Sequence, residues 1–261
     1  MPQTDTDGRF DAVTRIAREA GDLARRLFAE RDFGTFELKG HQDYLTEADG
    51  QVERLIESRL AEAFPDDTFF GEEEGGRYGA RTWVVDPIDG TANFARGIPH
   101  FSISMALVEG GRPQVGVVLN PMAGEIFAAR RGGGAFLNGR PMRVSAIADM
   151  RQATFELGWS TRLPLADYVA MVGRVTAAGA GFIRAGSGAL GMAYVAAGRI
   201  DGYAELHINA WDVLAGILLV EEAGGWTSDF LAGDGLTRGN PILASNLVLK
   251  DRFVEAIGIP F

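Results

Sequence analysis

Two aspartates lie three residues apart at the end of an apolar run, in the stretch Trp83–Phe94 with the sequence WVVDPIDGTANF. The β-branched valines before Asp86 predict the end of a buried strand. Pro87 cannot donate a ladder hydrogen bond, so we expect the strand to stop there, with Asp86 at its carboxyl end and Asp89 one turn further on.

A glycine and a threonine follow these acids directly. The backbone N–H groups of Gly90 and Thr91 are placed to open a helix, which is a favourable position for a phosphate group. Two carboxylates repel a phosphate unless cations lie between them, so the stretch indicates a phosphatase site with several metal ions. The alternative is a surface turn at Asp89-Gly90 with Asp86 as a cap, because Asp-Gly pairs are common in turns.

Acids elsewhere in the chain are placed to join the same site. The triplet Glu72–Glu74 directly follows the strand-like segment Thr68–Phe70. One of these glutamates is therefore expected to bridge a metal ion and to take a proton from water. Asp212 lies in the first turn of a strongly apolar predicted helix, where it either caps that helix or binds a metal ion from a rigid position.

The elements that must position these side chains can be predicted from the spacing of apolar residues. That spacing predicts a helix from Phe10 to Phe28 and a second helix after Asp49, and we interpret Asp49 as a capping residue rather than a metal ligand. Alternating residues and turn signals from Phe101 to Met142 predict an antiparallel meander, which the two helices would cover.

The second half mixes helix and strand signals, with the change placed at Arg143–Ala153. Its segment Gly186–Gly191 matches G-x-G-x-x-G, the pattern of dinucleotide-binding folds. That fold needs an acid at the end of a second strand, and Asp201 or Glu205 would have to supply it. The helix between would be very short, so we favour close helix packing through small residues. The three histidines share no ligand spacing and are interpreted as non-catalytic.

Composition limits the class of protein. The 261 residues suffice for one large domain or two closely packed halves. A formal net charge of −10 argues against non-specific nucleic-acid binding, and an anionic substrate would need bound metal ions to invert the local field. The absence of cysteine excludes disulfides and thiolate nucleophiles. No signal peptide or long apolar run is seen, so a cytoplasmic protein without membrane contact is expected.

Five blocks together resemble the inositol monophosphatase family, in the family's order and over nearly the whole chain: Lys39–Asp49, Gly71–Glu73, Asp86–Phe94, Gly186–Ala189 and Glu205–Asp212. The resemblance implies a mixed α+β fold, a layered αβαβα sandwich shared with fructose-1,6-bisphosphatases. Residues 1–145 would form an N-terminal half with the antiparallel sheet and the main metal site. Residues 146–261 would form a C-terminal half with substrate-side residues, in one compact unit.

The resemblance also implies an activity, the Mg²⁺-dependent hydrolysis of a small phosphorylated alcohol, with inositol 1-phosphate as the first candidate. Two or three Mg²⁺ ions would be held by Glu72, Asp86, Asp89, Asp212 and the carbonyl group of Ile88. Glu72 and Thr91 would activate the attacking water together with Asp89, and the N–H groups of Gly90 and Thr91 would hold the phosphate. The substrate's hydroxyl groups would contact Asp89, Ser187, Gly188 and Glu205. A homodimer inhibited by lithium is implied as well.

Several alternatives stay open. Trp159 stands where a small polar residue is expected to line the substrate pocket. Ala92 follows Thr91, where histidinol-phosphate phosphatases of the same family tend to carry arginine, yet histidinol phosphate remains an alternative substrate. A haloacid-dehalogenase mechanism needs Asp-x-Asp-x-Thr, with the acids two apart rather than three. A non-catalytic binding partner that uses this fold is the alternative outside enzymes.

Overall fold

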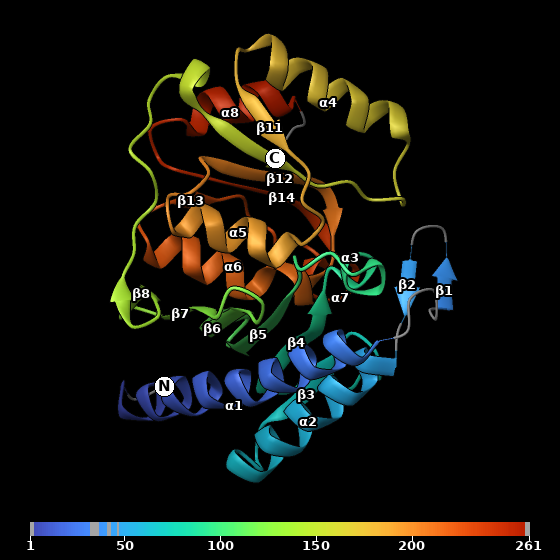
Figure 1. Cartoon of the computed structure of the whole chain (residues 1–261). Helices are drawn as coiled ribbons and strands as arrows, with labels where there is room; N and C mark the ends of the chain where they lie inside the picture. Colours follow the sequence, from blue (N-terminus) through green and yellow to red (C-terminus); the bar gives the residue numbers. More distant parts are fainter. Residues whose placement is uncertain (1–2, 32–36, 41–42, 46, 259–261) are drawn as a thin grey trace.

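Helices and sheets alternate in five layers in the computed structural model of the chain, which describes residues 3–31, 37–40, 43–45 and 47–258 (Figure 1). Helices α1 (Gln3–Glu30) and α2 (Glu47–Ala63) cover the outer face of a seven-stranded sheet. Helices α5 (Gly188–Ala196) and α6 (Ala210–Glu222) lie between this sheet and a five-stranded one. Helices α4 (Leu165–Ala177) and α8 (Lys250–Ile257) cover the far side. The predicted αβαβα sandwich is confirmed.

The seven-stranded sheet follows the chain from strand to strand, in the order β3-β4-β5-β6-β7-β8-β9. Only the β3–β4 pair is parallel, and the others form the predicted antiparallel meander. The strands are β3 (Thr68–Gly71), β4 (Arg81–Asp89), β5 (Ser102–Glu109), β6 (Arg112–Asn120), β7 (Glu125–Arg130), β8 (Gly134–Leu137) and β9 (Arg140–Pro141). Short helix α3 (Thr91–Arg96) follows β4.

Strand β4 does not stop at Pro87, so that prediction is wrong. Asp86 pairs with Ser104 of β5 and Asp89 pairs with Ser102, which leaves one extra residue on β4 between the two pairs. Such a bulge removes the need for a ladder hydrogen bond at the proline, and bulges commonly redirect side chains beside active sites. The interrupted register allows both aspartates to approach one point.

Neighbouring residues of β4 point to opposite faces and fill two different cores. Val84 packs in the cluster around α5 and α6, whereas Val85 packs in the cluster under α1 and α2. Both valines are fully buried, because the sheet is covered on both faces. This double cover holds the end of β4, and therefore its two aspartates, in a fixed place.

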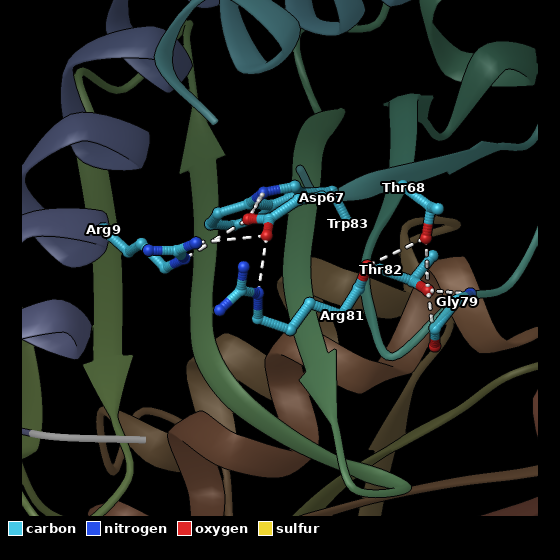
Figure 2. Close-up of polar contacts among 7 residues, drawn as sticks. All are labelled: Arg9, Asp67, Thr68, Gly79, Arg81, Thr82 and Trp83. Carbon is cyan, nitrogen blue, oxygen red and sulfur yellow. Dashed lines mark hydrogen bonds and ion pairs between the residues drawn. The ribbon is translucent and has the colours of Figure 1, made fainter. Parts of the chain in front are cut away.

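A buried carboxylate ties α1 to the start of the β3–β4 pair (Figure 2). The Asp67 side chain is 1% exposed and accepts hydrogen bonds from Arg9 Nε (3.2 Å), Arg81 Nε (2.7 Å) and Trp83 Nε1 (3.2 Å). Nearby, the Thr68 hydroxyl donates to the carbonyl oxygen of Arg81 at 2.8 Å. These bonds fix the strand that leads into the acidic turn.

Replacing Asp67 by alanine is expected to lower the free energy of unfolding by about 3–5 kcal/mol, because two arginines and an indole lose a buried acceptor. Equilibrium unfolding in urea measures this loss. Asp22→Ala is the control, since its ion pair with Arg25 is exposed and should contribute less than about 1 kcal/mol. A loss as small for Asp67→Ala would contradict the prediction.

The five-stranded sheet has the order β11-β10-β12-β14-β13, with β10 parallel to both of its neighbours and β14 antiparallel to β12 and β13. Its strands are β10 (Thr154–Leu157), β11 (Gly181–Ile183), β12 (Gly202–Ile208), β13 (Trp226–Thr227) and β14 (Asn240–Ser245). The described elements also include a 3₁₀ turn (Met150–Gln152), α7 (Gly235–Arg238) and two antiparallel strands, β1 (Glu37–Gly40) and β2 (Asp43–Leu45). The division of the chain at residue 145 stays a prediction.

The G-x-G-x-x-G segment leads into α5, which packs closely against β12 and α6, and it does not belong to a doubly wound dinucleotide unit. A Cβ on Gly191 would lie 2.6 Å from the ring of Tyr203, and one on Gly216 of α6 would lie 2.4 Å from the Met192 side chain of α5. Contacts this close admit only glycine, which agrees with the packing interpretation. Within the described ranges, none of the helices combines the length and apolar character that a membrane span requires.

Candidate active site

Three aspartates from two distant parts of the chain meet at one point. Asp86 and Asp89 come from the end of β4, and Asp212 comes from the first turn of α6. Each offers a carboxylate oxygen, and these oxygens all lie within 4.8 Å of one another. Asp86 is 1% and Asp89 7% exposed, and Asp212 is partly exposed. The structure thus brings together three of the four predicted acidic metal ligands.

The charges of these aspartates oppose one another. Burial raises the pKa of Asp86 well above its usual range, and the charges of Glu72, Asp89 and Asp212 raise it further. Burial and the Asp89 charge likewise raise the pKa of Asp212 to about 8. A buried set of carboxylate oxygens of this kind suits a hard divalent cation, which removes the repulsion by supplying positive charge. The residues present therefore fit the Mg²⁺ ions that the sequence predicts.

Asp212 also caps its helix. Its Oδ2 atom accepts a hydrogen bond from the backbone N–H of Asn209 at 3.1 Å, and the two residues form a reciprocal capping box. The capping bond fixes the orientation of the carboxylate that faces Asp86 and Asp89. The two interpretations of Asp212, as a cap and as a group facing the metal site, are therefore compatible.

Asp89 is held by four donors. Its Oδ2 accepts from the hydroxyl groups of Ser187 and Ser102 (3.1 Å for Ser102) and from the N–H of Ala189 at 2.8 Å. Its Oδ1 accepts from the N–H of Gly188 at 3.2 Å. Burial raises the pKa of Asp89, and these bonds oppose that rise. Ser187 and Gly188, which were predicted to contact substrate, thus also orient a predicted metal ligand.

Glu72 lies beside this group without joining its 4.8 Å set. It follows β3, its N–H donates to the carbonyl oxygen of Val85 at 3.1 Å, and it is half-buried. Its charge contributes to the raised pKa of Asp86. The backbone of Ile88 links two site residues. Its N–H donates a hydrogen bond to Asp86 Oδ1 at 2.9 Å, and its carbonyl oxygen accepts one from the Thr91 hydroxyl at 2.9 Å.

The Thr91 hydroxyl has a second acceptor that the sequence analysis missed. Its oxygen lies 3.1 Å from Oδ1 of Asp49, a residue of the first turn of α2 that is 1% exposed. The carboxylate of Asp49, which the sequence analysis interprets as a cap, therefore reaches the site. The signal in the sequence was an acid at the start of a predicted helix, at the end of the Lys39–Asp49 block. Residues 41, 42 and 46 of that block lie outside the residues that the structure describes.

Gly90 joins the two aspartates to α3 in a left-handed conformation, with φ +98°. A Cβ there would lie 3.1 Å from the carbonyl oxygen of Gly186 and 3.3 Å from that of His100. A larger residue would be strained and crowded, so the turn between Asp89 and Thr91 depends on glycine.

Two further glutamates, the buried Glu156 and the half-buried Glu205, have raised pKa values. Glu205 of β12 accepts a hydrogen bond from the Tyr203 hydroxyl at 2.6 Å, and burial raises the pKa of Glu205 to about 7. Glu156 of β10, which sequence reasoning missed, accepts from the N–H of Ala185 at 3.1 Å, and burial raises its pKa to about 7. The half-buried Trp159 follows Gly158, where a Cβ would lie 2.1 Å from the Glu205 carboxylate. Gly158, the residue before Trp159, therefore lies directly against Glu205, the predicted substrate contact.

These raised pKa values predict how stability depends on pH. Glu156, Glu205 and Asp212 bind protons more tightly in the folded than in the unfolded state, so the metal-free protein should lose stability as pH rises from about 4.5 to about 8. Each group contributes a slope of up to about 1.4 kcal/mol per pH unit. Urea unfolding in chelator from pH 5 to 9 measures this slope. The Glu205→Gln variant should show a shallower one, and a stability that rises with pH would contradict the prediction.

The comparisons with known proteins agree with this geometry. A sequence model of the inositol monophosphatase family matches residues 7–258. An "Inositol-1-monophosphatase" of Rhizobium meliloti is 44% identical over 250 residues, which cover 94% of this chain and 92% of that protein. A protein named "Nus factor SuhB" of Pasteurella multocida is 40% identical over 249 residues, with 93% of each chain covered.

Solved structures are similar over nearly the whole length. The extragenic suppressor protein suhB of Bartonella henselae has a TM-score of 0.89 and 36% identity, with 96% of this chain and 98% of that chain covered. An IMPase of Thermotoga maritima has a TM-score of 0.86 and 35% identity, with 95% and 96% covered. The fold of this chain is therefore similar to these structures along nearly its whole length.

Proposed function

The chain belongs to the inositol monophosphatase family, and on that premise we propose that it is a Mg²⁺-dependent hydrolase of small phosphate monoesters. The observation that supports this best is the convergence of Asp86, Asp89 and Asp212, whose negative charges repel one another and would be neutralised by bound cations. Glu72, the Ile88 carbonyl group and these aspartates would hold two or three ions. Mg²⁺ bound there supplies charge neutralisation for the phosphoryl group that is transferred.

The residues around Thr91 are arranged to take a proton from water. The Thr91 hydroxyl has one proton, so it donates either to the Ile88 carbonyl oxygen or to Asp49 at any moment. When it donates to Asp49, its oxygen is free to accept from a water molecule. The water proton then passes to Thr91 Oγ as the Thr91 proton passes to Asp49 Oδ1. Glu72 would assist as a second acceptor.

The phosphate and the alcohol would occupy opposite sides of Asp89. Gly90 and Thr91 would donate backbone N–H groups to the phosphate oxygens, and the absence of a side chain at Gly90 permits that approach. Ser187, Gly188 and Glu205 would contact the hydroxyl groups of the alcohol. Both carboxylate oxygens of Asp89 already accept hydrogen bonds from backbone N–H groups at the start of α5. These bonds would hold Asp89 in place between the phosphate and the alcohol.

Inositol 1-phosphate is the substrate that we propose first, because the relative from R. meliloti carries that activity in its name. Histidinol phosphate is the alternative within the family. A non-catalytic role is the second candidate, because relatives of 38–40% identity are named Nus factor SuhB.

Phosphate release with and without Mg²⁺ tests the proposal. Inositol 1-phosphate, histidinol phosphate, fructose 1,6-bisphosphate and 3′-phosphoadenosine 5′-phosphate serve as parallel substrates. Release that requires Mg²⁺ would support the site and identify the substrate class. A protein that binds Mg²⁺ but releases no phosphate from any of them would favour the non-catalytic candidate.

The homodimer and the cytoplasmic location stay predictions. Exposed apolar side chains at the edge of the five-stranded sheet support a dimer, namely Phe182 and Ile183 of β11 with Leu165 and Val169 of the neighbouring α4. Light scattering of the purified protein measures its mass in solution, and a monomer mass at micromolar concentration would reject the dimer.

A further inference from the structure

A buried carboxylate on α2 holds the acidic turn that carries Glu72. Glu53 is 1% exposed. One of its oxygens accepts from the backbone N–H of Glu73 at 3.0 Å, and the other accepts from that of Glu74 at 2.7 Å. The two peptide groups that follow Glu72 are therefore bound to a single side chain of a helix in another layer.

The turn is fixed from its other side as well. The N–H of Gly71 donates to the carbonyl oxygen of Gly75 at 2.8 Å, and the N–H of Glu72 donates to that of Val85 at 3.1 Å. A Cβ on Gly71 would lie 2.4 Å from the carboxyl carbon of Glu53, so the carboxylate lies directly against the backbone at the start of the turn. Only a glycine leaves room for this contact.

A carboxylate is required at position 53 because it must accept two backbone N–H groups at once. An ionised carboxylate accepts from both N–H groups, whereas a glutamine offers one accepting oxygen and turns an N–H₂ donor toward the other N–H. Burying an acid next to Glu72, Glu73 and Glu74 is unfavourable in itself. The two charge-assisted bonds offset that cost only while the turn keeps this conformation.

We propose that Glu53 is a positioning residue that aims the Glu72 carboxylate at Asp86 and thereby sets the affinity of the metal site. The inference rests on the proposed function, in which Glu72 is a metal ligand. Glu53 touches neither metal nor substrate in this assignment. It acts through the backbone of the turn, as partners of metal ligands commonly do.

The test is the affinity of the Glu53→Gln variant for Mn²⁺, measured on the whole protein by electron paramagnetic resonance without substrate. We expect binding about 10–100-fold weaker than in the wild type, which is the usual effect of removing a partner of a ligand. In turnover, the Mg²⁺ concentration for half-maximal rate should rise by a similar factor, while KM for the phosphate ester changes less than about twofold.

Glu74→Gln is the matched control. It removes an acid from the same turn together with the exposed Arg54–Glu74 ion pair (3.0 Å), but it keeps the N–H group that donates to Glu53. We expect its Mn²⁺ affinity and its activity to stay within about twofold of the wild type. A general effect of charge near the site would change both variants alike and would overturn the proposal.

Gly71→Ala tests the same contact from the backbone side, should Glu53→Gln fail to fold. Its methyl group displaces the Glu53 carboxylate, so the same loss of Mn²⁺ affinity is expected. If Glu53→Gln folds and binds Mn²⁺ as tightly as the wild type, the proposal is overturned. If only Gly71→Ala folds, wild-type Mn²⁺ affinity in that variant overturns it. A wild type without Mg²⁺-dependent phosphate release would count against the proposed function alone, because Mn²⁺ affinity is measured without turnover.

Discussion

Replacing Asp86 by asparagine is expected to lower kcat/KM for Mg²⁺-dependent phosphate release by at least about 10³-fold, and to stabilise the metal-free protein at the same time. The amide retains an oxygen that can accept from the N–H of Ile88, so the bulge in β4 should persist. It removes an acid whose pKa is raised well above its usual range by burial and by its neighbours' charges. Above pH 7 the neutral amide needs neither a bound proton nor a buried charge.

Phosphate release, thermal unfolding in chelator and thermal unfolding in Mg²⁺ measure the three parts of this result. The melting temperature in chelator should rise by about 2–4 °C for each kcal/mol of repulsion removed, and the increase caused by Mg²⁺ should shrink. Asp22→Asn, which changes an exposed acid, should leave all three unchanged. An Asp86→Asn protein with wild-type turnover would show that Asp86 is not a metal ligand.

The Thr91→Val variant is expected to lose about 10²–10⁴-fold in kcat, the range that a positioned proton acceptor contributes. Valine keeps the shape of threonine but cannot link a water molecule to Asp49. Asp49→Asn should show a loss of similar size, because it removes the final acceptor of the same proton. The double variant should be hardly worse than either single one, since both changes interrupt one path.

Steady-state kinetics at saturating Mg²⁺, together with the pH–rate profile, check this prediction. Thr68→Val is the control. The Thr68 hydroxyl also donates to a backbone carbonyl group, that of Arg81, but this bond belongs to the network around Asp67 in Figure 2 and not to the candidate site. That variant should be less stable, with kcat unchanged once it is folded. A Thr91→Val enzyme within tenfold of the wild-type kcat would exclude the proton path through Thr91.

The layered fold could be predicted because local patterns and tertiary structure agree over most of the chain. The apolar stripe of α1, the alternating strands from Phe101 onward and the acid-led start of α6 each follow from residue spacing. The continuation of β4 through Pro87 could not be predicted in this way. A bulge depends on the register of the partner strand β5, which local sequence does not contain.

The same contrast between local sequence pattern and tertiary packing applies to the candidate site. Asp86, Asp89 and Asp212 stand out because acids follow or begin apolar elements. Asp49 and Glu156 were missed because their importance depends on where α2 and β10 pack. A capping position looks the same in sequence whether the carboxylate ends in solvent or beside Thr91. Burial, which raises the pKa of Glu156 to about 7, is a property of the assembled layers.

The four donors of Asp89 restrict how such a protein can evolve. Ser102 comes from β5 of one sheet, and Ser187, Gly188 and Ala189 come from the segment that leaves the other sheet and opens α5. Loss of a donor on either side would therefore change how the same carboxylate is held. Recombination that joins the first half of one relative to the second half of another would have to preserve this shared set of bonds. The bonds to Asp89 thus couple the two sheets of the fold, because donors from both sides hold one carboxylate.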